Sequence, residues 1–200
     1  EKVLEISKKL KKNNKFLIYD ESFADFYHTN DISLMKSNIL QENDNVIVLK
    51  SFGKTYGIPG IRLGILATGN KEKLIEFKKY IPIWNINSTA EIFLDLLPRY
   101  KNEYKESTLK IFNEANDFFH KFDSLNNEKI YVYRPTANFL LIRFFEENDL
   151  NKVTKNLFDS GFLVKTIIAR QGLPRNCLRI AVLNDEINNK VAGIINNSFI

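Results

Sequence analysis

Cysteine and histidine are both scarce in this chain of 200 residues. Its one cysteine, Cys177, has no second cysteine to pair with, which excludes an internal disulfide and a cysteine-based metal cluster. The two histidines, His28 and His120, lie far apart in the sequence, so we expect no zinc site. The composition therefore predicts a protein without a metal ion, in a reducing, cytoplasmic location.

Long apolar runs are also missing. No stretch approaches the roughly 20 apolar residues that are needed to cross a bilayer, and the first residues lack the basic and then apolar pattern of a secretory leader. We therefore expect no membrane partner. The chain opens on Glu1 within a helical pattern and without an initiator methionine, which indicates a piece of a longer protein.

Charge of neither sign dominates. There are 29 basic and 24 acidic residues, a net charge of +5, and 26% of the residues are charged, which is an ordinary share. The lysines are dispersed over helical patterns, as in residues 8–12, and form no arginine-rich arm, so we expect no nucleic-acid partner. A hydrophobic share of 44% is enough for one globular unit or two small ones.

Short apolar runs alternate with helical patterns in the first part of the chain. The runs at 16–19, 46–49 and 62–67 predict buried strands, and the spacing of apolar residues in 1–12 and 71–80 predicts helices. Continuous apolar strands between helices are typical of a mostly parallel sheet with helices on both faces. Three strands are too few for a complete doubly wound domain, so we expect an α/β domain that is only partly present.

The second part of the chain has a different pattern. Residues 86–122 are helical in pattern, followed by strands near 130–133, 137–144, 162–167 and 177–183 and by helices near 147–159 and at the end of the chain. These strands would form a small sheet covered by the last two helices. We place the domain boundary near residue 90, with residues 1–90 in a first domain and residues 91–200 in a small second α/β domain.

A glycine-rich stretch after the second strand carries the chemistry. Residues 51–64 read SFGKTYGIPGIRLG, in which four glycines permit tight turns and close approach of the backbone to a ligand. A Walker phosphate loop around Lys54 fails, because it needs a glycine five residues before Gly53, where Val48 stands. The Ser-x-x-Lys of penicillin-interacting enzymes fits Ser51 and Lys54, but the accompanying Ser-Asp-Asn and Lys-Thr-Gly are absent.

The flanking residues favour a Schiff-base lysine over a lysine that merely lies on the surface. A partly desolvated lysine beside a cationic phosphate site loses its charge readily, and its neutral amine can attack an aldehyde. Ser51, three residues before Lys54, and Arg62, eight residues after it, would then bind the phosphate of the cofactor. The planar guanidinium suits this task because it can donate two parallel hydrogen bonds.

This spacing, within Gly-Ile-Pro-Gly-Ile-Arg-Leu-Gly, resembles that of the class I and II aminotransferases among the pyridoxal-phosphate enzymes of fold type I. The resemblance extends over essentially the whole chain but covers only the back half of such an enzyme. It implies pyridoxal 5′-phosphate as the cofactor and Lys54 as its point of attachment. It also implies that residues 1–90 are the C-terminal part of a three-layer, cofactor-binding large domain and that residues 91–200 are the small domain.

Three more residues match the family's site, and a fourth, Phe23, departs from it. By this resemblance Asp20 would pair with the pyridine nitrogen of the cofactor and keep it protonated, although an aspartate that ends a strand is often a turn or cap residue. Arg179 would bind the substrate α-carboxylate, with a structural ion pair as the alternative. Asn138 would help to line the site. Phe23 stands where many members have a tyrosine, and its ring cannot donate a hydrogen bond to the cofactor.

Phe23 and the sequence after Lys54 are most like the branch that holds histidinol-phosphate aminotransferase and threonine-phosphate decarboxylase, and the phenylalanine leans toward the decarboxylases. Trp84 resembles part of that branch's site-lining segment, or belongs to an ordinary helix entry. The branch often has an arginine where this chain has Lys165. Lys165 or Arg170 is thus the candidate cation for a distal substrate phosphate.

The resemblance implies the transfer of an amino group between an amino acid and a keto acid, by a homodimer. A decarboxylation that uses the same cofactor and a purely structural role in a larger multidomain protein are the alternatives. Several parts of the family's site belong to its front half, including the turn over the cofactor phosphate and the aromatic side chain that stacks on the cofactor ring. We therefore expect the isolated chain to bind the cofactor weakly or not at all.

Overall fold

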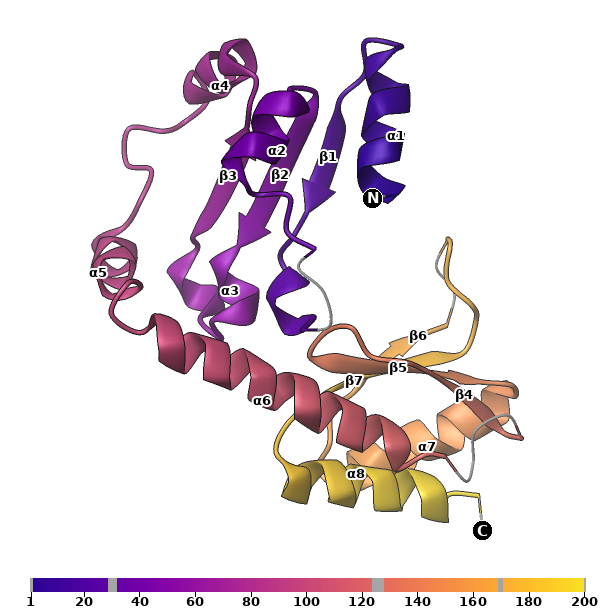
Figure 1. The fold of residues 1–200 in the computed structure, drawn as a ribbon. Coiled ribbons are helices and arrows are strands. Elements are labelled where there is room, and N and C mark those ends of the chain that lie inside the picture. Colours follow the sequence, from indigo (N-terminus) through magenta and orange to yellow (C-terminus); the bar gives the residue numbers. More distant parts are fainter. Residues whose placement is uncertain (1, 29–31, 124–127, 169–170, 200) are drawn as a thin grey trace. The chain divides into compact units, whose positions relative to one another are not determined.

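The computed structural model describes residues 2–28, 32–123, 128–168 and 171–199. The chain divides into two compact units, Glu1–Glu106 and Ser107–Ile200, which are taken one at a time below (Figure 1). The division lies within helix α6 (Lys101–His120). The boundary near residue 90 that was inferred from the sequence falls in an earlier helix and remains a prediction about the family's domains.

The first unit is built on a three-stranded sheet in the order β1-β2-β3. Strand β1 (Leu17–Asp20) pairs in parallel with β2 (Val46–Ser51), while β3 (Gly64–Thr68) is antiparallel to β2. The expected strands are therefore present, but the sheet is mixed. The connection from β2 to β3 folds into two short helices and does not cross over a face of the sheet, and without a crossover the next strand must run antiparallel.

Helices α1 (Lys2–Lys11) and α2 (Ser37–Glu42) contribute to the small core of the first unit. The buried members of this core include Val46 and Val48 of the central strand. Side chains that point to the opposite face of the sheet are less covered, since Ile18 is 64% exposed. The expected cover of helices on both faces is thus incomplete in the described part of the chain.

Further helices of the first unit follow the sheet. They are η1 (Ala24–Phe26), α3 (Phe52–Thr55), η2 (Pro59–Ile61), α4 (Lys71–Lys78) and α5 (Ser88–Leu96). Two of them have asparagine N-caps, in which Asn70 accepts from the backbone N–H of Lys73 and Asn87 from that of Ala90, both at 2.9 Å. These caps satisfy donors that a helix start leaves unpaired, so the sequence itself fixes where both helices begin.

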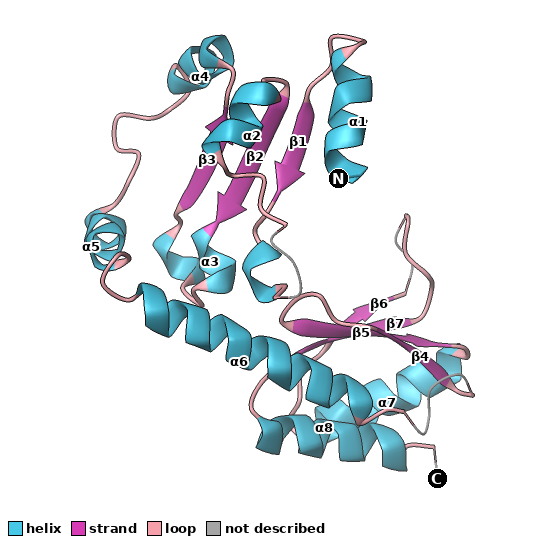
Figure 2. Cartoon of the chain, viewed as in Figure 1, coloured by secondary structure: helices cyan, strands magenta, loops and turns pink. Residues whose placement is uncertain are grey.

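The second unit is an antiparallel sheet in the order β4-β5-β7-β6. Its strands are β4 (Ile130–Tyr133), β5 (Phe139–Phe144), β6 (Lys165–Ile167) and β7 (Cys177–Ala181). Helices α7 (Glu147–Asp159) and α8 (Asp185–Asn197) lie on one face of this sheet (Figure 2). The core between them is fully buried, because Leu140, Ile142 and Leu178 alternate with residues that point to the open face.

None of the helices in the described part of the chain is long and apolar enough to span a bilayer. The described residues also contain no group of three or more histidine, cysteine, aspartate and glutamate side chains arranged to hold a metal ion.

Candidate cofactor site

The carboxyl ends of β1 and β2 lie at the same edge of the first sheet, because the two strands are parallel. Asp20 is the last residue of β1 and stands opposite Leu49 in the register, two residues before Ser51. The backbone N–H of Ser51 donates to the hydroxyl oxygen of Ser22 at 2.9 Å, which joins the segments that follow the two strands. This edge is where ligands bind in open parallel sheets.

Asp20 serves as a turn residue and is exposed at the same time. Its Oδ1 accepts a hydrogen bond from the backbone N–H of Ser22 at 2.9 Å, a bond typical of a turn after a strand. The side chain is nevertheless exposed at the sheet edge. The turn bond fixes the orientation of the carboxylate, so the two interpretations of this residue are compatible.

Glu21 is a residue whose role the sequence analysis missed. Its side chain is only 2% exposed, and its carboxylate accepts hydrogen bonds from the hydroxyl of Ser33, at 2.9 Å, and from the backbone N–H of Leu34. Its own backbone N–H donates to the carbonyl of Leu49 at 2.7 Å. Glu21 therefore anchors the loop after Asp20 from inside the unit. A glutamate beside Asp20 gives no local sign of this burial.

Lys54 lies in the four-residue helix α3, directly after β2. Its side chain is exposed, so the desolvation that we expected is not supplied by the described residues. Ser51 is the N-cap of α3, yet its hydroxyl makes no capping bond. A Cβ on Gly53 would lie 3.0 Å from the Cα of Pro59, which leaves little room for a larger residue where the two parts of the loop pass each other.

The chain returns to the same end of the sheet at Arg62. Ser51 is the register partner of Gly64, the first residue of β3, and Arg62 stands two residues before that partner. Arg62 has a left-handed backbone with φ 55°, and its guanidinium, which donates to the carbonyl of Pro59 at 3.3 Å, is exposed. Lys54 and Arg62 therefore lie near the two ends of the connection between β2, which ends at Ser51, and β3, which begins at Gly64. A hydroxyl and a guanidinium at one sheet end are a donor set that fits a phosphate.

Phe23 lies in the loop after Asp20 and is 36% exposed. Its ring is 6.4 Å from that of Phe26, which is buried in η1. The structure thus gathers Asp20, Phe23 and Ser51 at the edge of the first sheet, together with the loop that carries Lys54 and Arg62.

Asn138 and Arg179 belong to the second unit and are placed there independently of this edge. The carbonyl of Asn138 accepts from the backbone N–H of Val182 at 2.9 Å. Arg179 is exposed on the open face of β7, with its guanidinium 5.3 Å from the ring centre of Phe139. Its register partner on β6 is Lys165, a second exposed cation. Arg170 lies outside the described residues.

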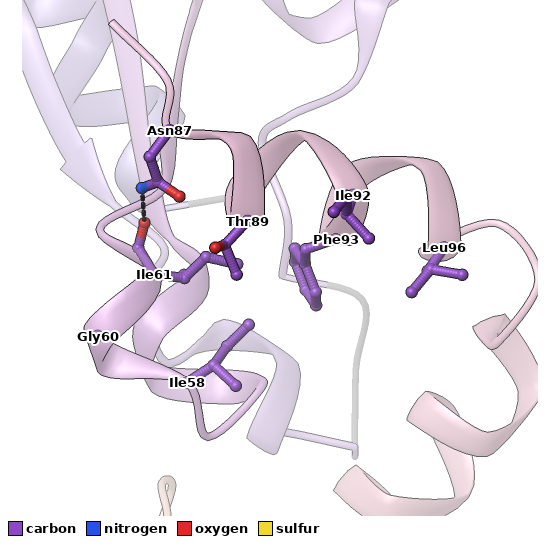
Figure 3. A pocket seen from close by; sticks show the side chains of 8 residues that line it. All are labelled: Ile58, Gly60, Ile61, Asn87, Thr89, Ile92, Phe93 and Leu96. Carbon is purple, nitrogen blue, oxygen red and sulfur yellow. Dashed lines mark hydrogen bonds between the residues drawn. The ribbon is translucent and has the colours of Figure 1, made fainter.

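An apolar pocket of about 550 Å³ lies beside the loop between Lys54 and Arg62. Figure 3 shows its lining residues on the η2 region and on α5, where the side chain of Asn87 donates to the carbonyl of Ile61 at 3.0 Å. The lining side chains are Ile58, Ile61, Asn87, Thr89, Ile92, Phe93 and Leu96, with Gly60. None of them is a predicted site residue. Trp84, in the preceding segment, is 93% exposed.

Comparison with known proteins identifies the family of the chain. The profile of the family described as aminotransferase class I and II matches residues 1–195. L-serine phosphate decarboxylase of Sulfurospirillum multivorans is 32% identical over 178 residues, which cover 86% of this chain and 45% of that protein. Histidinol-phosphate aminotransferase of Clostridium novyi is 29% identical over 191 residues, which cover 96% of this chain and 50% of that protein.

A solved structure gives the same result for the fold. The histidinol-phosphate aminotransferase of Clostridium acetobutylicum matches with a TM-score of 0.82 and 26% identity, over 94% of this chain and 56% of that one. The chain thus spans about half the length of the relatives it matches.

Proposed function

Since the chain belongs to the class I and II aminotransferases, a family that depends on pyridoxal phosphate and has fold type I, we propose that it forms the back half of an enzyme that transfers an amino group between an amino acid and a keto acid. The observation that carries the proposal is the meeting of three chain segments at the edge of the first sheet. There the bond from Ser51 to Ser22 and the pairing of Ser51 with Gly64 bring the Asp20, Lys54 and Arg62 segments together.

The residues of this edge have distinct tasks in the proposed site. Ser51 and Arg62 would hold the cofactor phosphate, and Asp20, whose carboxylate is oriented by its turn bond to Ser22, would pair with the ring nitrogen. Lys54 would hold the cofactor and would move the α-proton of the substrate. Phe23 would line the site without donating a hydrogen bond. When bound, pyridoxal phosphate supplies the electron sink for the reaction.

Arg179 supports the same function from the second unit. An arginine exposed on an apolar strand, stacked on Phe139, presents a planar donor pair for a carboxylate. Lys165 is its direct neighbour across the sheet, and two cations in such a position repel each other. We infer that they bind a substrate with two anionic groups, one of them the α-carboxylate. Asn138, in the same unit, is proposed to help to line the substrate site.

A decarboxylase is the second candidate, because one of the relatives is an L-serine phosphate decarboxylase at 32% identity. The same residues would serve either reaction, and the two reactions differ in which bond of the substrate is broken. In both cases we propose a homodimer in the cytoplasm.

Absorbance spectroscopy on the full-length protein tests this function. With added pyridoxal phosphate we expect a visible band that Lys54→Ala abolishes and that Lys71→Ala, a matched control on α4, retains. A wild-type protein without the band, or a Lys54→Ala variant that keeps it, would contradict the proposal. With amino-acid substrates, formation of a keto acid indicates transamination and release of carbon dioxide indicates decarboxylation. For the isolated chain we expect no more than a slight rise in melting temperature with the cofactor.

A further inference from the structure

A second group of polar side chains lies next to the Ser51–Lys54 segment and has no task in the function proposed above. Its centre is Asp25, in η1. One carboxylate oxygen of Asp25 accepts a hydrogen bond from the Nζ of Lys50 at 2.6 Å, and the other accepts one from the hydroxyl of Tyr104. The side chains of Lys50 and Asp25 are 18% and 21% exposed, so this ion pair is largely shielded from water.

The same group reaches the other side of the lysine. The ring of Tyr104 stacks on that of Tyr56 with a centroid distance of 4.0 Å and an interplanar angle of 10°. Tyr56 also meets the ring of Phe93 edge-on at 5.4 Å. Lys50 stands four residues before Lys54 and Tyr56 two residues after it. Asp25 and Tyr104 therefore contact the chain on both sides of the lysine in the sequence.

The raised pKa values of the two tyrosines keep the hydrogen bond between Tyr104 and Asp25 formed over a wide pH range. Burial raises the pKa of Tyr104, and its bond to the Asp25 carboxylate raises it further. Burial and the charge of Asp25 also raise the pKa of Tyr56. Both hydroxyls therefore stay protonated well above neutral pH, and Tyr104 remains a donor to Asp25.

We propose that Asp25 and Tyr104 are positioning residues, which hold the segment that carries Ser51 and Lys54 in place against the loop that follows Asp20. The inference rests on the function proposed above. Three distant parts of the chain meet in this contact, namely the loop after β1, the end of β2 and the first turns of α6. Asp25 and Tyr104 act through Lys50 and Tyr56, the residues that flank the lysine.

Two conservative variants of the full-length protein test this role. Tyr104→Phe keeps the stacked ring and removes only the hydroxyl, and Asp25→Asn keeps the shape and removes the charge. We expect either change to raise the dissociation constant for pyridoxal phosphate about fivefold to tenfold, the effect of losing roughly one hydrogen bond. We also expect a shift in the midpoint of the pH titration of the visible band, and faster amide exchange over residues 51–56 without the cofactor.

The controls separate positioning from general stability. Tyr80→Phe removes a hydroxyl from a side chain that is 79% exposed and should change neither the dissociation constant nor the titration. Lys50→Arg keeps the ion pair to Asp25 and should stay close to wild type. A lower melting temperature with an unchanged dissociation constant and titration midpoint overturns the inference. A wild-type protein with no band that depends on Lys54 overturns the proposed function and the inference with it.

Discussion

The hydroxyl oxygen of Ser22 accepts a hydrogen bond from the backbone N–H of Ser51 at 2.9 Å. Ser22 is 8% exposed, so water does not readily replace it. Ser22→Ala should therefore leave the Ser51 N–H unpaired and lower the free energy of unfolding by about 1–3 kcal/mol. Urea denaturation followed by circular dichroism measures this. Ser88→Ala, at an exposed helix position, should change it by no more than about 0.5 kcal/mol, and equal effects of the two variants would contradict the assignment.

Glu21 should matter as an acceptor more than as a charge. Glu21→Ala removes the acceptor of Ser33 and of the Leu34 N–H and should cost about 2–3 kcal/mol. Glu21→Gln keeps one carbonyl oxygen for Leu34, and its amide can donate to the hydroxyl of Ser33, so the loss should be smaller. Thermal unfolding of the three proteins compares them. A glutamine variant as unstable as the alanine variant would show that the charge itself is required.

Gly69 should tolerate no side chain. A Cβ there would lie 1.9 Å from the carbonyl oxygen of Leu40, and this backbone atom cannot rotate away. We expect Gly69→Ala to cost at least about 2 kcal/mol. Gly193, within α8, has nothing within 4 Å of such a Cβ, and Gly193→Ala should gain about 0.5–1 kcal/mol from helix propensity. Urea midpoints that move in the same direction for both variants would contradict this comparison.

Stability should fall in alkali, in part through Tyr104. Its pKa in the folded protein is raised above the ordinary value of 10.0, while in the unfolded chain it is not. Well below the ordinary value of 10.0 the phenol is protonated in both states, and its full contribution to the free energy of unfolding is present. As the pH rises past about 10, the unfolded chain loses the proton first, so the free energy of unfolding falls. Tyr104→Phe should make the fall between pH 9 and about 11 less steep, and an identical slope in both proteins would exclude this residue as a source.

Arg179 and Lys165 should separate two parts of substrate recognition in the full-length protein. Arg179→Gln should raise KM for every amino-acid substrate, by about a hundredfold, because each carries an α-carboxylate. Lys165→Met should raise KM only for substrates with a second anionic group. Steady-state kinetics with a phosphorylated and an unphosphorylated amino acid tests this. A Lys165→Met variant that impairs both substrates equally would contradict the assignment.

Much of the local structure follows from the sequence alone. The apolar runs predicted each strand of both sheets, because alternating or continuous burial depends on backbone periodicity. The asparagines at Asn70 and Asn87 begin helices α4 and α5, because a short side-chain oxygen can accept from the first free N–H groups. The spacing of Ser51, Lys54 and Arg62 could likewise be read from the sequence, and the three residues lie at or within the connection between two paired strands. Their tasks toward the cofactor stay predictions.

Only the tertiary structure decided which segments meet. The antiparallel direction of β3, the exposure of Ile18, the burial of Glu21 and the contact of Asp25 with Tyr104 all depend on residues far away in the chain. No local pattern distinguishes a glutamate that anchors a loop from one that faces solvent, because the difference lies in the partners that folding brings to it. The sequence determined the elements and the order of the motif along the chain, and long-range packing determined the environment of each side chain.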